Sequence, residues 1–546
     1  MADQATAMVT LFTEFYFFLT IVLMFFIHIG FCMYEVGVAR TKNVQHTLLK
    51  NAMAIPVVGL AFFLFGMWIY IGLQGWPVAS TTVSFSTGFE PWSEKLAPNL
   101  SDRISGVFWA AFALFGMTAA SIVSGSIIER AKTSGFLIIA VYVGAIAWVV
   151  PAAWGWSGNG WMTQYLGFHD QYCSAVLHSV SGFACLGILL NLGPRIGKFA
   201  ADGTPREIPA HNPWMVTIGL FMIYVGFFGF YAACHIPMAN VAAEGQTAYW
   251  TATNIYGFPI TLSGVTMNFL LALFGGMMTA YMVSGGNAFW TFSGGLTGLI
   301  SASAGNDLYH PVVALAIAIV GTVMAYYAHN WVEKKFKLDD AVGAVAVHGY
   351  CGLFGGIVAG FALWGYPAIM PSAGTLVTLS EGAGWFGTNA EGLPIVTPIG
   401  NAIASFTFAI GFGLIPGYIL GKVLKVVGLL RVDPKVELTG LDGEHVGSTY
   451  PNISGAEAAF EALQRKEGAS KDRFGRAGTP ARPSCIPHHL NRIGARHEHR
   501  RDDVLETHRT HSGLSIPRNR GSIFLRGARL LPGLHFVADR DGEETS

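Results

Sequence analysis

Long apolar runs constrain this 546-residue chain more than any other feature of its sequence. Hydrophobic residues account for 52% of the chain and charged residues for only 12%, about half the charged share of soluble domains. The runs are continuous rather than alternating, which is typical of helices whose solvent is lipid. The formal net charge is zero, so no overall field favours nucleic acid as a partner.

A helix needs roughly 20 mostly apolar residues to cross the hydrocarbon core of a bilayer. Eleven segments meet or approach this length, and we predict an all-α polytopic membrane protein with eleven transmembrane helices. The predicted spans are residues 11–38, 51–72, 106–128, 135–154, 170–192, 216–234, 261–283, 289–304, 311–328, 341–364 and 399–424. The eighth of these is short and rich in glycine.

Lysine and arginine gather in alternate loops between the predicted spans. The loops after the first, third, fifth and ninth spans and the segment after the last contain Arg40, Lys42, Lys50, Arg130, Lys132, Arg195, Lys198, Arg206, Lys334, Lys335, Lys337, Lys425, Arg431 and Lys435. The other loops are acidic or neutral apart from Lys95 and Arg103, and the seventh carries no charge. Because basic loops stay in the cytoplasm, we expect the N-terminus outside and the C-terminus inside. No lysine or arginine precedes the first apolar run, which favours a retained span over a cleaved signal peptide.

One pattern of aspartate, histidine and glycine occurs twice. The spacing D-x7-H-x3-G is found at Asp170, His178 and Gly182 and again at Asp340, His348 and Gly352. The copies begin the fifth and tenth predicted spans, so five spans separate them. An odd number of spans makes the two copies antiparallel in the membrane, which predicts a 5+5 inverted repeat plus a final helix.

The two repeated histidines are candidate pore residues. Eight residues of helix place each histidine roughly 12 Å from its aspartate, near the middle of the bilayer. Polar groups at this depth usually line a pathway, and a neutral imidazole can both donate and accept a hydrogen bond. His178 and His348 could therefore guide a small polar molecule or a proton. The alternative is a pair of core histidines bonded to helix carbonyls.

The repeated aspartates precede apolar runs, where a carboxylate can cap free backbone N–H groups. Capping alone is the favoured interpretation for Asp340. Asp170 opens a span on the outer side, where it could also concentrate cations. The remaining membrane histidines receive no role, because they lie alone or at span ends: His28, His169, His235, His310 and His329.

The sequence indicates no metal site and no cofactor. Its six cysteines are scattered without a CxxC pair, so neither a disulfide framework nor a zinc site is expected. Zinc needs three or four ligands, and no third histidine or carboxylate shares the repeat.

Four stretches resemble the ammonium transporter/methylammonium permease/Rhesus family. They are VGVARTKNVQHTLLKN, GSIIERAKTSG, DDAVGAVAVHGYCGLFGGI and TGLDGEHVGSTY, and the similarity runs from about residue 10 to 450. The resemblance implies an eleven-helix inverted-repeat fold and a homotrimer with one pore per subunit. It also implies a multi-pass protein of the plasma or inner membrane.

The same resemblance implies roles for individual residues. His178 and His348 match the twin pore histidines, and Asp170 the outer aspartate. Phe115, counted back from Ile128-Glu129-Arg130, and Phe230, in GFFGF, match two stacked gating rings. In the outer vestibule Trp156 matches the tryptophan and Cys234 falls on the serine that recruits ammonium.

The chain departs from the family pattern at the outer vestibule. DQYCSAVLH replaces the usual Gly-Gly-Thr stretch between aspartate and histidine, and Cys234 replaces the serine. Another vestibule aromatic falls on Ala111, with Phe112 beside it but turned about 100° away on a helix. A cation over an aromatic face gains about 0.5–2 kcal/mol, so outer capture of ammonium is expected to be weaker.

The expected function is ammonium transport. NH4+ is recruited outside, and NH3 is conducted through a twin-histidine pore, with or without a returned proton. The alternatives are an ammonium sensor on the same fold and a Rhesus-like channel for neutral NH3 or CO2. A membrane enzyme is disfavoured because no nucleophile–base constellation is present in the sequence. The family suggests a PII-type signal protein as a partner at the cytoplasmic face.

Composition divides the chain into three regions. Residues 1–430 form the predicted transmembrane domain, and residues 431–467 a cytoplasmic region that contains the C-terminal motif. Residues 468–546 are rich in arginine, histidine and proline without helical or strand periodicity, which predicts disorder. This tail either contacts anionic lipid or nucleic acid, or is an out-of-frame or read-through extension without a selected role. It resembles no output domain, which favours transport over sensing.

Overall fold

Helices make up most of the described chain. The computed structural model describes residues 2–78, 87–96, 105–237, 251–369, 388 and 394–443, all within one unit, Met1–Ala462. The predicted tail 468–546 and residues 444–467, with most of the C-terminal motif, lie outside the described residues. The three-region division of the chain therefore stays a prediction.

The helices before the first strand include two longer spans that are interrupted by π-helical turns. They are α1 (Ala2–Val38), α2 (Val44–Ala61) continuing through η2 (Phe62–Gly66) into α3 (Met67–Gly72), α4 (Ser105–Ser126), α5 (Thr133–Tyr142) continuing through η4 (Val143–Ala147) into α6 (Val149–Gly155), α7 (Trp161–Leu166), η5 (Ser174–Ser179), α8 (Val180–Leu192) and α9 (Pro213–Ala233). Two short 3-10 turns are η1 (Thr41–Asn43) and η3 (Glu94–Leu96).

The second half begins with three two-residue strands and then returns to helices. The strands β1 (Ile236–Pro237), β2 (Ala252–Thr253) and β3 (Pro259–Ile260) form one antiparallel sheet in that order. The helices are α10 (Leu262–Val283), α11 (Ala288–Ala302), α12 (Pro311–Phe336), η6 (Val345–Tyr350), α13 (Cys351–Ala362), α14 (Pro398–Phe406), η7 (Thr407–Leu414), α15 (Ile415–Val426) and α16 (Pro434–Thr439).

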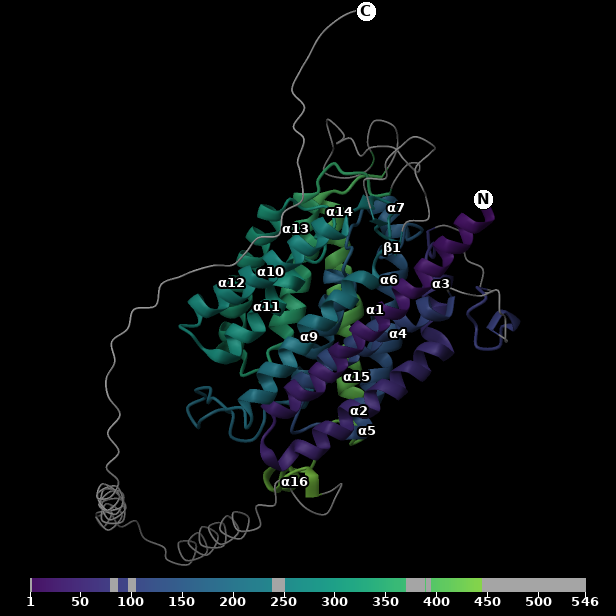
Figure 1. The fold of residues 1–546 in the computed structure, drawn as a ribbon. Coiled ribbons are helices and arrows are strands. Elements are labelled where there is room, and N and C mark those ends of the chain that lie inside the picture. Colours follow the sequence, from purple (N-terminus) through teal and green to yellow (C-terminus); the bar gives the residue numbers. More distant parts are fainter. Residues whose placement is uncertain are drawn as a thin grey trace, which may run out of the picture. The chain divides into compact units, whose positions relative to one another are not determined.

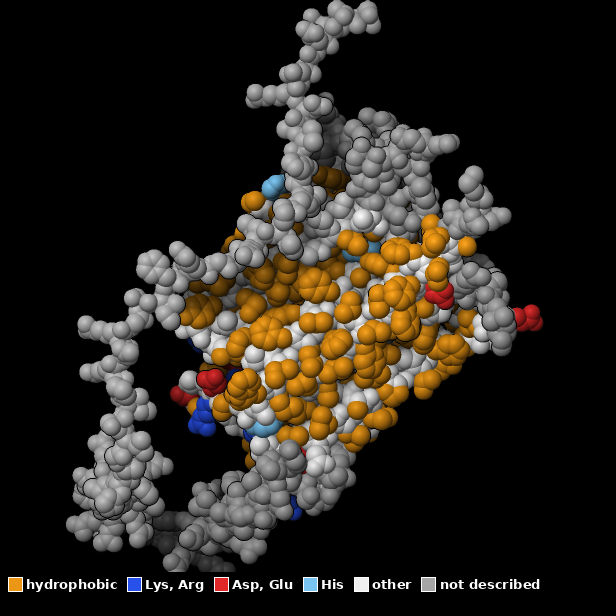
Figure 2. Space-filling model, viewed as in Figure 1, with side chains coloured by type: hydrophobic (Ala, Val, Ile, Leu, Met, Phe, Trp, Pro, Cys, Tyr) orange, Lys and Arg blue, Asp and Glu red, His pale blue; other side chains and the backbone are white. Residues whose placement is uncertain are grey.

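The predicted class, a polytopic helical membrane protein, is confirmed. Ten helical segments of the described chain are long and apolar enough to cross a membrane. The short eighth segment, residues 289–304, coincides with α11, which has 15 residues, so the count of eleven spans stays a prediction. Figure 2 shows a face covered across its middle by hydrophobic side chains, with the few visible charges near its margins. Such a surface suits contact with lipid rather than water.

The two repeat-bearing segments pack against each other inside the bundle. α1 runs beside α9 and α4 (Figure 1), and η5 and η6 lie in contact with each other and with α8 and α13. The helices that follow the repeats, α8 and α13, are therefore central rather than peripheral. This arrangement brings together histidines that are 170 residues apart.

A buried ion cluster joins the predicted cytoplasmic loops. Glu129 accepts hydrogen bonds from Arg40 Nε at 2.8 Å and from Arg195 Nη1 at 3.1 Å. Arg195 also forms two bonds to Asp339, each 2.9 Å long, and Arg130 donates to the backbone oxygen of Asp339 at 2.6 Å. Burial by itself would raise the pKa of Glu129, but Arg195 and Arg40 lower that pKa to about 2. The cluster ties together four loops that lie far apart in the sequence.

The segment around α16 binds the same end of the bundle. Lys42 Nζ donates to the backbone oxygen of Glu437 at 2.7 Å. The backbone N–H of His46 donates to Asp442 Oδ1 at 2.8 Å, and Asn43 accepts from the N–H of Leu441 at 3.0 Å. The described beginning of the C-terminal motif is therefore attached to η1 and the start of α2.

We expect Glu129→Gln to destabilise the fold and to remove part of its acid sensitivity. A carboxyl whose pKa falls from 4.5 to about 2 on folding stabilises the protein fully above pH 4.5 and loses this contribution as the pH falls toward 2. The contribution is on the order of 3 kcal/mol. Chemical unfolding of the purified protein between pH 7 and pH 3 measures it. Glu207→Gln, at an exposed glutamate, is the control. If the free energy of unfolding of Glu129→Gln changed with pH as steeply as that of the wild type, the assignment would be contradicted.

Candidate functional site

The first repeated histidine lies on a π-helical turn that an aspartate caps. In η5 the N–H of His178 donates to the oxygen of Cys173 at 3.1 Å, five residues back. Asp170 accepts from the N–H groups of Ser174 at 2.7 Å, Ala175 at 2.7 Å and Val176 at 2.9 Å. The carboxylate is fully buried and both of its oxygens are used. Asp170 therefore caps the turn, as the sequence suggested.

The second copy has the same layout with fewer bonds. Asp340 Oδ2 accepts from the N–H of Val345 at 2.7 Å, at the start of η6, which carries His348. A backbone position with positive φ precedes each turn: Cys173 at 63° and Gly343 at 71°. Glycine adopts this conformation without strain, whereas a cysteine pays about 1–2 kcal/mol. The unusual DQYCS stretch is thus a strained version of the glycine-containing copy.

The two histidines meet side by side in the core. His178 Nδ1 and His348 Nδ1 are 3.1 Å apart, and the rings are nearly parallel, with centroids 5.2 Å apart at 23°. The side chains are 0% and 3% exposed. At this distance one nitrogen donates the hydrogen and the other accepts it, so a single proton lies between the rings. Two neutral imidazoles satisfy this contact.

The repeated glycines allow the close crossing that brings the rings together. A Cβ atom on Gly182 would lie 2.1 Å from the backbone nitrogen of Gly349. A Cβ atom on Gly352 would lie 2.3 Å from the backbone oxygen of Ser174. Both contacts are with backbone atoms, which cannot rotate away. The glycine of each copy therefore packs against the π-helical turn of the other copy.

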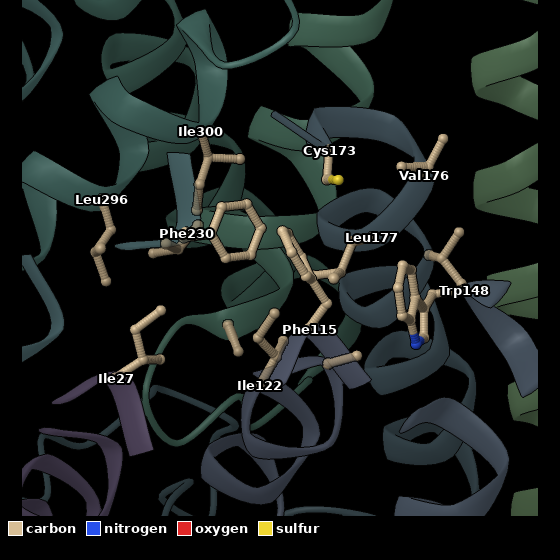
Figure 3. Packing of buried hydrophobic residues seen from close by; sticks show 14 of the residues in the cluster. Ile27, Phe115, Ile122, Trp148, Cys173, Val176, Leu177, Phe230, Leu296 and Ile300 are labelled. Carbon is tan, nitrogen blue, oxygen red and sulfur yellow. The ribbon is translucent and has the colours of Figure 1, made fainter. Parts of the chain in front are cut away.

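Aromatic rings extend the histidine pair in both directions. The ring of Phe230 lies 5.6 Å from that of His178, and Phe115 lies 4.3 Å from Phe230. Figure 3 shows Phe115 and Phe230 side by side among buried apolar side chains. On the other side of the pair, Phe31 of α1 lies 6.4 Å from His348. The result is a continuous row of buried rings through the bundle.

Trp156 continues the row beyond Phe115, at 5.2 Å between centroids. Its indole N–H donates to the backbone oxygen of Gln171 at 2.8 Å. The centroid of the Phe112 ring lies 4.9 Å from that of Trp156. Phe112 therefore contacts the tryptophan, although it leaves the helix in a different direction from its neighbour Ala111. The predicted vestibule residue Trp156 and the predicted gate residues Phe115 and Phe230 are thus brought together.

Cys234 follows α9 and lies beside the same row. Its thiol donates to the backbone oxygen of Phe230 at 3.2 Å, and its own backbone oxygen accepts from Gln171 Nε2 at 2.5 Å. Cys173 is also fully buried, and its thiol lies near that of Cys234. Cys234 therefore places sulfur beside the row, and sulfur is a weaker hydrogen-bond acceptor than a hydroxyl oxygen.

Two histidines without a predicted role, next in sequence to Cys234 and Asp170, contact side chains of other segments. His235 lies between Tyr16, at 3.2 Å, and Tyr172, at 2.7 Å. His169 contacts Asp307 at 3.2 Å and lies over the ring of Tyr256 at 4.6 Å. Their partners are distant in sequence, and no spacing in the chain signals them. Within the described residues no three histidine, cysteine or acidic side chains converge as metal ligands would.

Comparison with known proteins gives consistent relatives. The model of the Ammonium Transporter Family matches residues 14–450. Ammonium transporter Amt2 of Archaeoglobus fulgidus is 32% identical over 466 residues, covering 82% of this chain and 90% of the relative. A solved structure named Sensor Amt Protein matches with a TM-score of 0.64 at 22% identity, covering 82% of this chain and 100% of that one. Saccharomyces cerevisiae Mep2 matches with a TM-score of 0.59 at 18% identity, covering 77% and 87%. The two structures show the fold alone.

We expect Gly182→Ala to destabilise the protein by about 1–3 kcal/mol, because its methyl group forces the two π-helical turns apart. The melting temperature of the purified protein measures the effect. Gly106→Ala in α4 is the matched control, since a Cβ atom there meets nothing within 4 Å. Equal melting temperatures for the two variants would show that the crossing is not tightly packed.

Proposed function

The chain belongs to the ammonium transporter family, and from that premise we propose that it conducts ammonia through the row of buried rings around His178 and His348. The observation that carries the proposal is the 3.1 Å contact between two buried imidazoles in a row that is otherwise aromatic. Its named relatives are transporters rather than enzymes.

The chemistry follows from the cost of moving a bare cation through an apolar core. An unpaired ammonium ion would lose its hydration without replacement, at many kcal/mol, whereas neutral NH3 loses far less. NH4+ therefore gives up its proton near His178, and NH3 passes both rings as a hydrogen-bond donor and acceptor. The proton either returns outside or follows along the imidazole pair, because each ring can bind a proton on one nitrogen while it releases one from the other.

Phe115 and Phe230 act as the gate in this proposal. Their rings are in contact at 4.3 Å, so one ring has to turn before a molecule reaches His178. Both side chains are fully buried, which keeps water from forming a continuous file past the histidines. The gate thus separates the site of deprotonation from the aqueous mouth.

Trp156, Asp170 and Cys234 form the outer recruitment site. The indole face of Trp156 attracts a cation, worth about 0.5–2 kcal/mol. Asp170 contributes through its charge rather than as a direct ligand, because backbone N–H groups occupy both of its oxygens. Cys234 supplies a thiol in place of a hydroxyl, so recruitment of NH4+ is weak and the site relies on the inner pore.

A specific observation favours a second candidate, an ammonium sensor on the same fold. The thiol of Cys234 and the strained Cys173 change the mouth while the histidine pair stays intact. A sensor binds ammonium without net flux, and a Rhesus-like channel conducts NH3 or CO2 without current. Ion-coupled transport gives both flux and current in proteoliposomes, so the two measurements separate the three functions.

The proposal extends to assembly and orientation. We expect a homotrimer with one pore per subunit in the plasma or inner membrane, with the N-terminus outside. The basic loops and α16 then face the cytoplasm, where a PII-type signal protein is the expected partner. The repeated pattern around η5 and η6 supports an inverted repeat, since each copy caps and packs its turn in the same way.

We expect His178→Ala and His348→Ala each to lower ammonium flux by about 100-fold or change its coupling to protons, because each removes an imidazole from the path. Ammonium-driven current and luminal pH in proteoliposomes measure both quantities. His28→Leu is the control, since it removes a buried imidazole of α1 that lies outside the pair. Unchanged flux and current in both single variants would refute the mechanism.

We expect Cys234→Ser to lower the ammonium concentration at half-maximal flux by about tenfold, because a hydroxyl oxygen accepts a hydrogen bond from NH4+ better than sulfur does. Cys351→Ser in α13 is the control, since it makes the same exchange away from the mouth. The concentration dependence of flux measures the effect. An equal value for wild type and Cys234→Ser would remove Cys234 from the recruitment site.

A further inference from the structure

The two repeated aspartates differ in one respect that the repeat does not predict. Both oxygens of Asp170 accept hydrogen bonds, but Asp340 Oδ1 has no hydrogen-bond partner among the described residues. The Asp340 side chain is only 7% exposed. The hydroxyl of Ser126 lies next to this carboxylate, but without the geometry of a full hydrogen bond to it or to any other described residue. A buried carboxylate oxygen in this state is costly unless a cation or another donor approaches it.

Asp340 lines a cavity of about 400 Å³ between α11, α12 and the loop after α8. His329 and Trp290 line the same cavity, and their rings meet edge to face at 5.1 Å. The carboxylate, the imidazole and the indole are together suited to a small cation, which needs acceptors and tolerates an aromatic neighbour. The cavity is large enough for such an ion with several water molecules.

Among the described residues that line the cavity, Asp340 is the buried acid that has no ion-pair partner. Lys198 forms an ion pair with Glu333 at 2.6 Å. Arg195 is held by Asp339 at 2.9 Å. Arg206 and Lys334 also line the cavity, but both are exposed, so solvent screens their repulsion.

α1 connects the cavity with the histidine pair. Phe31 contacts His348, Tyr34 one turn later stacks on Phe289 at 6.3 Å, and Val38 lines the cavity together with Phe289. Seven residues of helix span about 10 Å. The cavity therefore lies about two helical turns from the inner end of the pore, on the side of the basic loops.

We propose that Asp340 Oδ1, with Ser126 and His329, forms a second ammonium site on the cytoplasmic side of the histidine pair. The site rests on the proposed function, because NH3 that has passed the histidine pair takes up a proton from water on the cytoplasmic side and becomes the ammonium ion that binds here. An ion held there occupies the exit, so rising internal ammonium slows inward transport. Asp340 Oδ2 keeps its bond to Val345 meanwhile, and η6 stays capped.

Asp340→Asn tests the site while it keeps the cap. The amide oxygen still accepts from Val345, whereas an NH2 group replaces the free carboxylate oxygen and repels a cation. Glu333→Gln is the matched control, because it removes the same charge from the same cavity at a residue already paired with Lys198. The probe is thallium(I), a monovalent cation close to ammonium in size that scatters X-rays anomalously.

Crystals of the full chain soaked in thallium(I) should show an anomalous peak beside Asp340 in wild type and in Glu333→Gln. The peak should vanish in Asp340→Asn and under excess ammonium. In proteoliposomes Asp340→Asn should raise, by about tenfold, the internal ammonium concentration that halves the rate of inward ammonium transport. No wild-type peak, or an equal peak in Asp340→Asn, overturns the site. A peak without any wild-type ammonium flux supports the site and overturns the proposed function instead.

Discussion

The contact between His178 and His348 is the constraint around which the rest of the structure is arranged. Two imidazoles 3.1 Å apart in a membrane core are bonded to each other and have to be held against separation. Three devices hold them: a carboxylate that caps each turn, the wider backbone of a π-helical turn, and a glycine at the crossing. Each device is encoded within the thirteen residues of one repeat copy.

The two repeat copies have the same capped π-helical turns but differ in which polar groups they leave without a hydrogen bond. Both carboxylate oxygens of Asp170 are bonded, and the neighbouring thiols are weak acceptors, so this copy holds its histidine firmly and, in the proposed function, offers a cation little beyond charge and an indole face. Around Asp340 one oxygen remains free beside a cavity. In the proposed function, two antiparallel copies of one motif serve opposite sides of the membrane with different affinities, and the difference lies in a few side chains rather than in the fold.

The sequence predicted those features that depend on local pattern. Apolar runs predicted the membrane class, and the spacing of Asp170 and Asp340 before apolar runs predicted their capping. Features that depend on distant partners could not be predicted. His235 is held by Tyr16 and Tyr172, which are 219 and 63 residues away in the sequence. The ring of Phe112 contacts Trp156 because of a side-chain direction that helical geometry alone does not specify. The functional roles of the histidines, gate rings and mouth residues stay predictions.

The central claim is that the buried imidazole pair lies on a path for ammonia. The most direct measurement is stopped-flow recording of luminal pH in proteoliposomes of the wild-type chain under an inward ammonium gradient, compared with protein-free vesicles of the same lipid. If ammonia crosses the protein, the lumen of the proteoliposomes becomes alkaline faster, in proportion to the amount of protein. Identical rates with and without protein, at an orientation and density verified for the same vesicles, would contradict the account.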